Sequence, residues 1–194
     1  MKSIIALLRP ALVATAILLV VVCGIYPVAV RAVGRLAFRE KADGSLIVDR
    51  DGTVRGSRLI AQPFSGTGYF HPRPSAAGVH GYDAANSRGS HLGPTSRKLA
   101  EQIKARIAAY RAENGLSAQT PVPADAVTAS ASGLDPHISP RNAQLQSARV
   151  ARERGLPESA VGRLIRRHTV GPQFGLLGAP GVNVLELNRD LDAL

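Results

Sequence analysis

The sequence predicts an α+β protein in which one N-terminal transmembrane helix is followed by a single mixed α/β domain. Three observations lead to this fold class. An uncharged run lies near the N-terminus, no other apolar run approaches spanning length, and the remaining chain alternates short β-like stretches with helical periodicity. We therefore divide the chain into a short tail (1–9), a transmembrane helix (10–30) and one domain (31–194).

The run from Pro10 to Val30 contains no charged residue. As a helix it would span roughly 31 Å, close to the ~30 Å hydrocarbon core of a bilayer. A cleaved signal peptide would also begin with an apolar run, but that run is normally about 7–15 residues long. A lipoprotein signal ending at Cys23 and a buried core helix are two further interpretations. Valines precede the cysteine where small residues are usual, and the run has no polar face.

The composition limits the chemistry of the domain. The net charge is +10, which suits nucleic acid, anionic lipid or an acidic protein partner. Aromatic residues make up only 4%, which argues against nucleic-acid binding by stacking. The single cysteine, Cys23, lies in the apolar run, so the domain has no internal disulfide.

Residues 31–41 are expected to extend the transmembrane helix, and Ala42-Asp43-Gly44 is expected to end it. A β-hairpin is expected next, with strands at 45–48 and 58–61 around an Asp51-Gly52 turn. The stretch 63–94 is rich in Gly, Pro, Ser and Ala but carries four aromatic residues. Because disordered linkers usually lack aromatic residues, we expect an ordered loop that packs on the domain.

The second half of the chain predicts three helices and a strand. The first helix covers 95–114, with Leu99, Ile103, Ile107 and Tyr110 on one face. The second begins at the Ser139-Pro140 cap and ends at Gly155, and the third covers about 158–168. Residues 182–187 (VNVLEL) are predicted as a final strand.

Two kinds of catalytic site are conceivable from the residue types. Ser130, Ser132, Asp135, His137 and Ser139 could form a hydrolase triad, but no GxSxG motif is present and turn and capping roles explain the same residues. The five histidines show no metal-ligand spacing, so we expect no metal site.

Nucleic-acid binding is the main alternative function. Ala151, Gly155 and Val161 match the small–turn–apolar spacing of a helix-turn-helix near 149–167. Its phosphate contacts would come from Arg149, Arg152, Arg154, Arg163, Arg166 and Arg167. An ordinary helix pair joined by a Gly-Leu-Pro turn explains the same pattern.

Several stretches together resemble a known family. They are DGSLIV, GSRLIAQPF, YFHPRPSA, LGPTSRKL, the long segment VPADAVTASASGLDPHISPRNAQLQSARVARERGL, and VNVLELNRDLD. The chain resembles the C subunit of the bacterial Kdp-type potassium-transporting P-type ATPase, from the apolar run to Asp192.

The resemblance implies an accessory subunit of an ATP-driven potassium importer in the bacterial cytoplasmic membrane, in contact with lipid and not with nucleic acid. Its implied partners are a channel-like potassium subunit, a P-type ATPase subunit and a small single-span subunit. The sequence has neither a DKTGT phosphorylation motif nor a Walker A loop, so we expect it to be no enzyme by itself, with hydrolysis on a partner.

The resemblance also implies that residues 31–194 form an extracytoplasmic domain. The local charges predict the opposite, since four basic residues follow the apolar run and two precede it. The family is described as a catalytic chaperone that raises the ATP affinity of the pump. We expect no tightly bound cofactor, and ATP only through the complex. Gln146 matches a characteristic glutamine of the family and is the candidate for nucleotide contact.

The remaining candidate residues are expected to contact partner subunits on the outer face of the channel-like subunit. They lie in two loop stretches: Tyr69, Phe70, Arg73, Pro74 and Ser75 in the first, and Ser132, Gly133 and Asp135 in the second.

Overall fold

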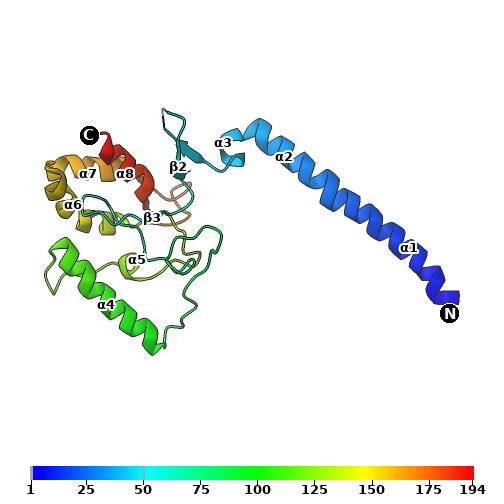
Figure 1. The fold of residues 1–194 in the computed structure, drawn as a ribbon, viewed down its shortest axis with the longest axis horizontal. Helices are drawn as coiled ribbons and strands as arrows, with labels where there is room; N and C mark the ends of the chain where they lie inside the picture. Colours follow the sequence, from blue (N-terminus) through cyan, green and yellow to red (C-terminus); the bar gives the residue numbers. More distant parts are fainter. Residues whose placement is uncertain (1, 50) are drawn as a thin grey trace. The chain divides into compact units, whose positions relative to one another are not determined.

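The computed structural model describes residues 2–49 and 51–194, which fall into two compact units, Met1–Arg55 and Gly56–Leu194. Figure 1 shows the elements of each unit along the chain. The fold class agrees with the sequence prediction, because one apolar helix is followed by a domain of mixed helices and short strands.

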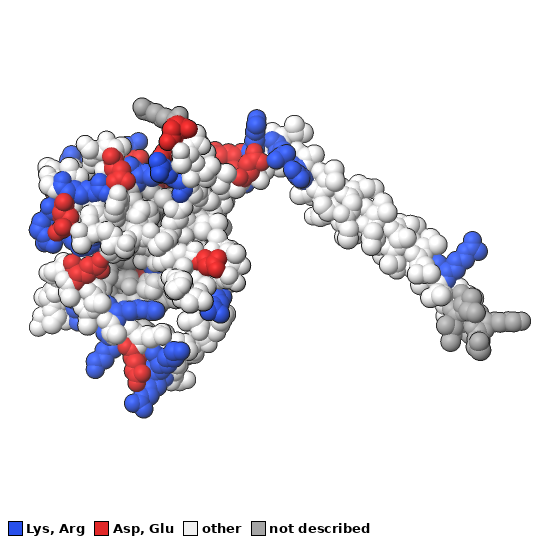
Figure 2. Space-filling model, viewed as in Figure 1, with Lys and Arg blue, Asp and Glu red and all other residues white. Residues whose placement is uncertain are grey.

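The first unit is dominated by one long helical stretch. It comprises α1 (Lys2–Leu18), a π-helical segment η1 (Leu19–Ile25) and α2 (Tyr26–Ala37). Within the described residues, the stretch Ala6–Ala37 alone is long and apolar enough to cross a membrane, and it contains the predicted span 10–30. No charged residue lies between Arg9 and Arg31, and Figure 2 shows the surface of the long helical stretch as white over most of its length. Where the membrane-embedded part ends stays a prediction.

The predicted helix at 31–41 is divided into two. Phe38 leaves the helical region, with φ −140° and ψ 47°, and separates α2 from the short α3 (Arg39–Ala42). Asp43 receives a hydrogen bond from Arg35, an ion pair across this break.

The predicted hairpin is present, but its second strand was placed wrongly. Strand β1 (Leu46–Val48) pairs with β2 (Val54–Ser57), and residues 58–61 form no strand. The turn explains the difference. Asp49 and Thr53 are joined by a backbone hydrogen bond of 2.9 Å, and the Asp51 carboxylate accepts from Thr53 N–H. The chain therefore re-enters the ladder directly after the turn.

The second unit contains five helices and three short strands. The helices are α4 (Arg97–Asn114), α5 (Ala124–Val127), α6 (Pro140–Arg154), α7 (Glu158–Arg167) and α8 (Val184–Asp192). The strands β3 (His137–Ile138), β4 (Thr169–Val170) and β5 (Gly181–Asn183) form an antiparallel sheet in the order β3-β5-β4. Val182 lies opposite both Ile138 and Thr169 in the two ladders.

The three predicted helices are confirmed, and their caps show why. Ser96 and Ser139 each accept a hydrogen bond from the backbone N–H three residues on, which satisfies an amide that the helix itself leaves unpaired. Gly115 and Gly155 end α4 and α6 in the left-handed conformation.

The predicted final strand at 182–187 is wrong beyond Asn183. The side chain of Asn183 accepts a hydrogen bond from Glu186 N–H and so begins a helix, α8, where strand alternation was expected. Val184, Leu187 and Leu191 then recur at helical spacing and are all buried. The run VNVLEL fits both patterns over its short length, and the cap decides between them.

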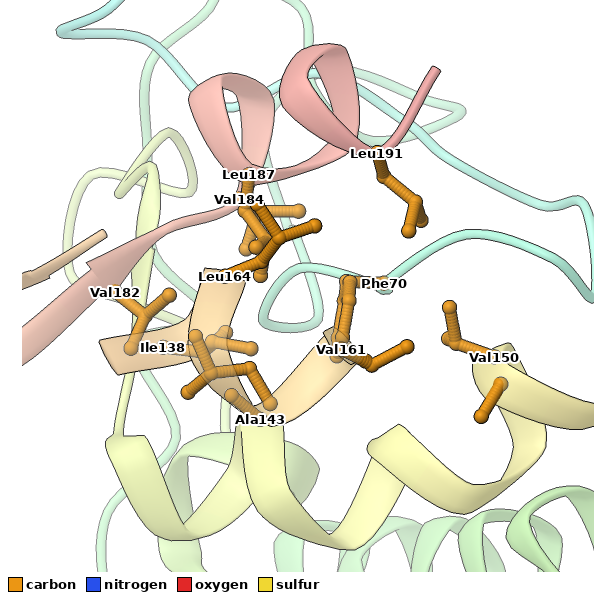
Figure 3. Close-up of a cluster of buried hydrophobic side chains, with 12 residues drawn as sticks. Phe70, Ile138, Ala143, Val150, Val161, Leu164, Val182, Val184, Leu187 and Leu191 are labelled. Atoms are coloured by element: carbon orange, nitrogen blue, oxygen red, sulfur yellow. The ribbon is translucent and has the colours of Figure 1, made fainter. Parts of the chain in front are cut away.

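The core of the second unit lies between α6, α7, α8 and β5 (Figure 3). Phe70, which belongs to the loop 63–94, is fully buried among the helical residues of this core. Figure 3 shows its ring between the leucines of α8 and Val150 of α6. The loop itself contains no helix or strand, yet it is packed on the domain, as the aromatic residues predicted.

Candidate functional site

Two amide side chains hold the loop 63–94 on the helices. Gln146 of α6 accepts a hydrogen bond from His71 N–H (2.8 Å) and donates one to His71 C=O (3.1 Å). Asn188 of α8 does the same for Phe70, with both hydrogen bonds at 2.9 Å. Each amide therefore acts on the loop as a neighbouring strand would, satisfying the N–H and C=O of one residue, and together the two amides serve the consecutive residues Phe70 and His71. We call Gln146 and Asn188 the amide clamp.

The candidate nucleotide residue, Gln146, is thus an interior residue. It is 1% exposed, and its remaining hydrogen bonds join Asn142 and Arg149, so both atoms of its amide are fully engaged. A hollow of about 170 Å³ lies beside it, lined by residues that include His71, Tyr110 and Glu113. Pockets that bind drug-sized ligands are about 300–1,000 Å³.

Arg149 is the least expected member of the interior. It is 2% exposed, and its guanidinium donates to Asn114 Oδ1 (3.0 Å), to Tyr69 C=O (2.9 Å) and to Thr67 C=O. Burial lowers the pKa of Arg149 from its ordinary value, against the effect of the nearby Glu113 carboxylate. Carbonyl and amide oxygens therefore replace water around this cation and tie the loop start to α6.

Tyr69 lies outside the core at the loop's edge. Its ring is stacked under the guanidinium of Arg154, 4.5 Å from the centroid, and its hydroxyl donates to Asp192 (3.3 Å). Arg154 also donates to Gly68 C=O and to Asp192. These contacts fix the partly exposed Tyr69 in one orientation.

A second cluster joins the two predicted stretches of partner-contact residues. Arg73 Nη1 donates to Asp135 Oδ2 (2.9 Å), and Ser75 Oγ donates to Gly133 C=O (2.6 Å). Ser75 Oγ also accepts from Tyr82 N–H (2.8 Å). Segments about sixty residues apart in sequence are therefore held together by direct polar contacts.

Gly133 is required by the geometry of this cluster. Its φ is +69°, and a Cβ there would lie 2.6 Å from Arg88 O and 2.8 Å from Ala77 N. Ser132 lies next to it, with its C=O accepting from Ser87 Oγ and its Oγ accepting from Leu134 N–H. Pro74 is partly buried between Arg73 and Ser75.

The charge of Asp135 is stabilised by this arrangement. Burial opposes ionisation, but hydrogen bonds from His137 and Arg73 outweigh it and lower the pKa of Asp135 to about 2. Burial raises the pKa of Tyr82 to about 12, and its hydroxyl donates to Arg73 C=O. Arg73 Nε has no hydrogen-bond partner within the described residues. It is the one such atom among the buried side-chain N and O atoms of that part of the chain.

A broad groove of about 780 Å³ runs past this cluster. Its lining includes Arg73, Asp135 and His137 together with residues of the segments 124–128 and 170–181. The Arg73–Asp135 ion pair is thus accompanied in the lining by further polar side chains and by small and apolar residues.

The structure thus separates the predicted residues into three environments. Arg73, Ser75, Ser132, Gly133 and Asp135 form one cluster with Pro74. Tyr69 lies apart beside Arg154, and Phe70 and Gln146 are in the interior, where their side chains hold the fold.

Sequence reasoning missed Asn188 and Arg149, the other residues that hold the loop. The sequence carries no signal that would have found them, because a polar residue in a helix is usually exposed and their burial is seen only in the structure.

The residues that suggested catalysis have other roles. Ser139 caps α6, and its N–H and Oγ both donate to Asp125. His71 and His168 pair with Glu113 and Asp190 at 2.8 and 2.9 Å. Among the described residues, no group of three His, Cys, Asp or Glu side chains could hold a metal ion.

The helix pair α6–α7 is present, but it does not favour nucleic-acid binding. Of the arginines expected to contact phosphates, Arg149 is buried and Arg154 is bound to Tyr69 and Asp192. The turn between the helices, at Gly155, is the connection expected of an ordinary helix pair.

Comparison with known proteins identifies the family. Residues 8–193 match the family described as "KdpC: K+-transporting ATPase, c chain". Proteins named "Potassium-transporting ATPase KdpC subunit" are similar over most of the chain. The one from Nitratidesulfovibrio vulgaris is 56% identical over 188 residues, 97% of this chain and 94% of the relative. Those from Koribacter versatilis and Mycobacterium tuberculosis are each 52% identical, over 87% and 96% of this chain and 84% and 98% of the relatives. The chain therefore belongs to the KdpC family, the c chains of K+-transporting ATPases.

Proposed function

We propose that the chain is the accessory, non-hydrolysing subunit of an ATP-driven, high-affinity potassium import complex in the bacterial cytoplasmic membrane. Its role is to assist the assembly and stability of the complex. Membership of the KdpC family supports the complex, and the apolar helix Ala6–Ala37 supports the membrane anchor.

One structural observation carries the assembly role. The loop 63–94 has no regular secondary structure, yet polar side chains bind its backbone to α6, to α8 and to the 132–135 segment. The loop is therefore already ordered before any partner binds, so binding loses little further conformational entropy. This favours a role of the loop as a rigid docking surface. Its partners in this proposal are the channel-like potassium subunit, the P-type ATPase subunit and the small single-span subunit.

The domain lies outside the cytoplasm in this proposal, as the family resemblance implies. Any increase in the ATP affinity of the pump would then act through the partner subunits, because nucleotide is cytoplasmic. The interior position of Gln146 supports this indirect route, since its hydrogen bonds are already used within the domain.

The docking surface is tested by purifying the complex from membranes with a tagged chain. The Tyr69→Ala/Arg73→Ala double variant should lose its partner subunits at a lower salt concentration than the unchanged chain. Arg97→Ala/Lys98→Ala, which changes two exposed residues of α4, is the control and should retain them. Unchanged stoichiometry and salt tolerance for the Tyr69/Arg73 variant, with an unchanged melting temperature of the subunit, would refute the assignment of this surface.

The side of the membrane is tested by a reporter fused after Leu194 that is active only outside the cytoplasm. An external signal supports assembly or gating from outside. A cytoplasmic signal would overturn the proposed topology and restore direct contact with ATP as an explanation.

A further inference from the structure

The turn between β4 and β5 exposes a group of large apolar side chains. Phe174 and Leu176 are 92% and 87% exposed, and Val170 and Leu177 are 61% and 62% exposed. We call residues 170–178 the apolar turn. Single exposed apolar residues are common on soluble domains, but four within eight positions make a contiguous apolar feature.

The apolar turn is held in a defined conformation. Gln173 and Leu177 exchange two backbone hydrogen bonds, of 2.8 and 2.9 Å, and Gly175 N–H donates to Pro172 C=O. Phe174 has a φ of +53°, which is costly for a residue with a side chain. A flexible loop would relax this strain. The turn therefore presents the Phe174 ring to solvent from a closed backbone structure.

The sequence around the turn carries no charge. From Thr169 to Leu185 there is no Asp, Glu, Lys, Arg or His, although the chain as a whole has a net charge of +10. Loops and helices that insert into the lipid surface usually combine apolar residues with nearby Lys or Arg, which bind anionic headgroups. The apolar turn itself supplies no such cation, although Arg166 and Arg167 lie just before it in the sequence, so the groove beside the turn decides between protein and lipid.

The turn is also continuous with the groove described above. Val170, Gln173 and Leu177 line the groove together with Arg73 and Asp135. An apolar projection next to a groove lined in part by an ion pair is a pattern of protein interfaces, in which buried apolar anchors are surrounded by polar contacts. A lipid surface has no segment to place in such a groove.

We propose that the apolar turn is a docking element that seats Phe174 and Leu176 in an apolar socket of a protein partner. A segment of the same partner occupies the adjoining groove, next to the Arg73–Asp135 pair. This inference rests on the proposed function, because the subunit that carries the socket is taken to be a membrane subunit of the same transport complex.

The position of the turn is tested with an environment-sensitive fluorophore on the full-length chain. Leu176→Cys in a Cys23→Ala background provides the single labelling site, and Leu59→Cys in the same background is the control, because Leu59 is 60% exposed outside the turn. Emission is compared for the subunit alone and for the purified complex, both in nanodiscs of the same lipids.

A blue shift of the label at position 176 only in the complex is the expected result, with no shift at position 59. A shift already present in the subunit alone would assign the turn to lipid. Disulfide cross-linking between two copies of the unlabelled Leu176→Cys variant under mild oxidation would assign the turn to self-association. Either result would overturn the proposal, as would a solvent-exposed label in the intact complex. If the unchanged chain does not copurify with the other subunits at all, the proposed function itself fails.

A second variant measures the strength of the contact. Phe174→Asn removes the ring and suits the positive φ, since Asn adopts this conformation more readily than Phe. The subunit should therefore keep or raise its melting temperature. Its affinity for the partner should fall about tenfold to a hundredfold, the effect of losing one buried aromatic side chain. Leu59→Asn should leave affinity unchanged, and equal effects of the two variants would refute a specific role of the turn.

Discussion

Gln146 and His71 are joined by two hydrogen bonds in which a side-chain amide pairs with a backbone amide, as two strands would pair in a sheet. Asn188 repeats the arrangement on Phe70. The loop 63–94 has no strand neighbour at this point, so the amide clamp satisfies its buried N–H and C=O groups. This explains how a Gly- and Pro-rich segment becomes part of the core.

Gln146→Ala should destabilise the domain by about 2–4 kcal/mol, because it leaves the backbone groups of His71 and one N–H of Arg149 without partners. The measurement is urea unfolding of the full chain in detergent. Gln144→Ala, on the exposed side of the same helix, is the matched control and should change stability by less than about 0.5 kcal/mol. Equal effects of the two variants would show that the clamp contributes nothing.

The two halves of the clamp should be energetically coupled, since they hold consecutive residues. Once Asn188→Ala has released Phe70, Gln146→Ala should cost less than it does in the unchanged chain, by about 0.5–1 kcal/mol. The double-mutant cycle is measured by the same unfolding experiment. As a control, Asn188→Ala and Ser96→Ala, which removes the cap of α4, should be additive. An additive Gln146/Asn188 pair would contradict a shared role.

Asp135 should make the stability of the domain depend on pH in the acid range. Its pKa is about 2 in the folded protein, below the ordinary value of 3.8, because the opposing effect of burial is outweighed by hydrogen bonds from His137 and Arg73. The stabilisation is therefore present above about pH 4 and is lost as the pH falls toward 2. Partial exposure to solvent reduces it to about 1–2 kcal/mol.

Asp135→Asn should remove this part of the acid transition, seen as a flatter plot of unfolding free energy against pH between about 4 and 2. Glu101→Gln, at an exposed carboxylate of α4, should leave the plot unchanged. An unchanged slope in the Asp135 variant would mean that its carboxylate is not held as the structure indicates.

The sequence allowed prediction of those helices whose ends are set locally. Ser96, Ser139, Gly115 and Gly155 cap α4 and α6 through contacts within four residues, so their chemistry is visible in the sequence. The run 182–187 is different, because six apolar-rich residues fit both a strand and a helix. The capping bond from Glu186 N–H to Asn183 makes it a helix, and burial of Leu187 and Leu191 against α7 and Phe70 stabilises that choice.

The candidate site was chosen from two loop stretches that were expected to contact partner subunits, and that contact stays a prediction. Arg73 was named in the first stretch and Gly133 and Asp135 in the second, and the structure joins the two stretches by hydrogen bonds that were not predicted. Arg149 and Asn188 could not be predicted, because a polar residue in a helix is usually exposed. Their burial depends on carbonyl groups of the loop, which lie about 80 and 118 positions away along the chain.

Gly133→Ala should disrupt the junction between the two predicted contact stretches. The new Cβ would lie 2.6 Å from Arg88 O and 2.8 Å from Ala77 N, both backbone atoms that cannot move aside alone, and the φ of +69° adds strain. We expect a loss of at least about 2 kcal/mol in the free energy of unfolding. The matched control for Gly133→Ala is Gly162→Ala, in the middle of α7. There the atom nearest to a new Cβ is the flexible end of Arg166, 3.7 Å away. Because alanine favours a helix over glycine, this variant should gain about 0.5–1 kcal/mol. Opposite signs for one chemical change would show that the conformation at Gly133, and not glycine content, holds the Arg73–Asp135 cluster together. A neutral Gly133→Ala would mean that Ser75 and Arg73 keep their partners without this close approach.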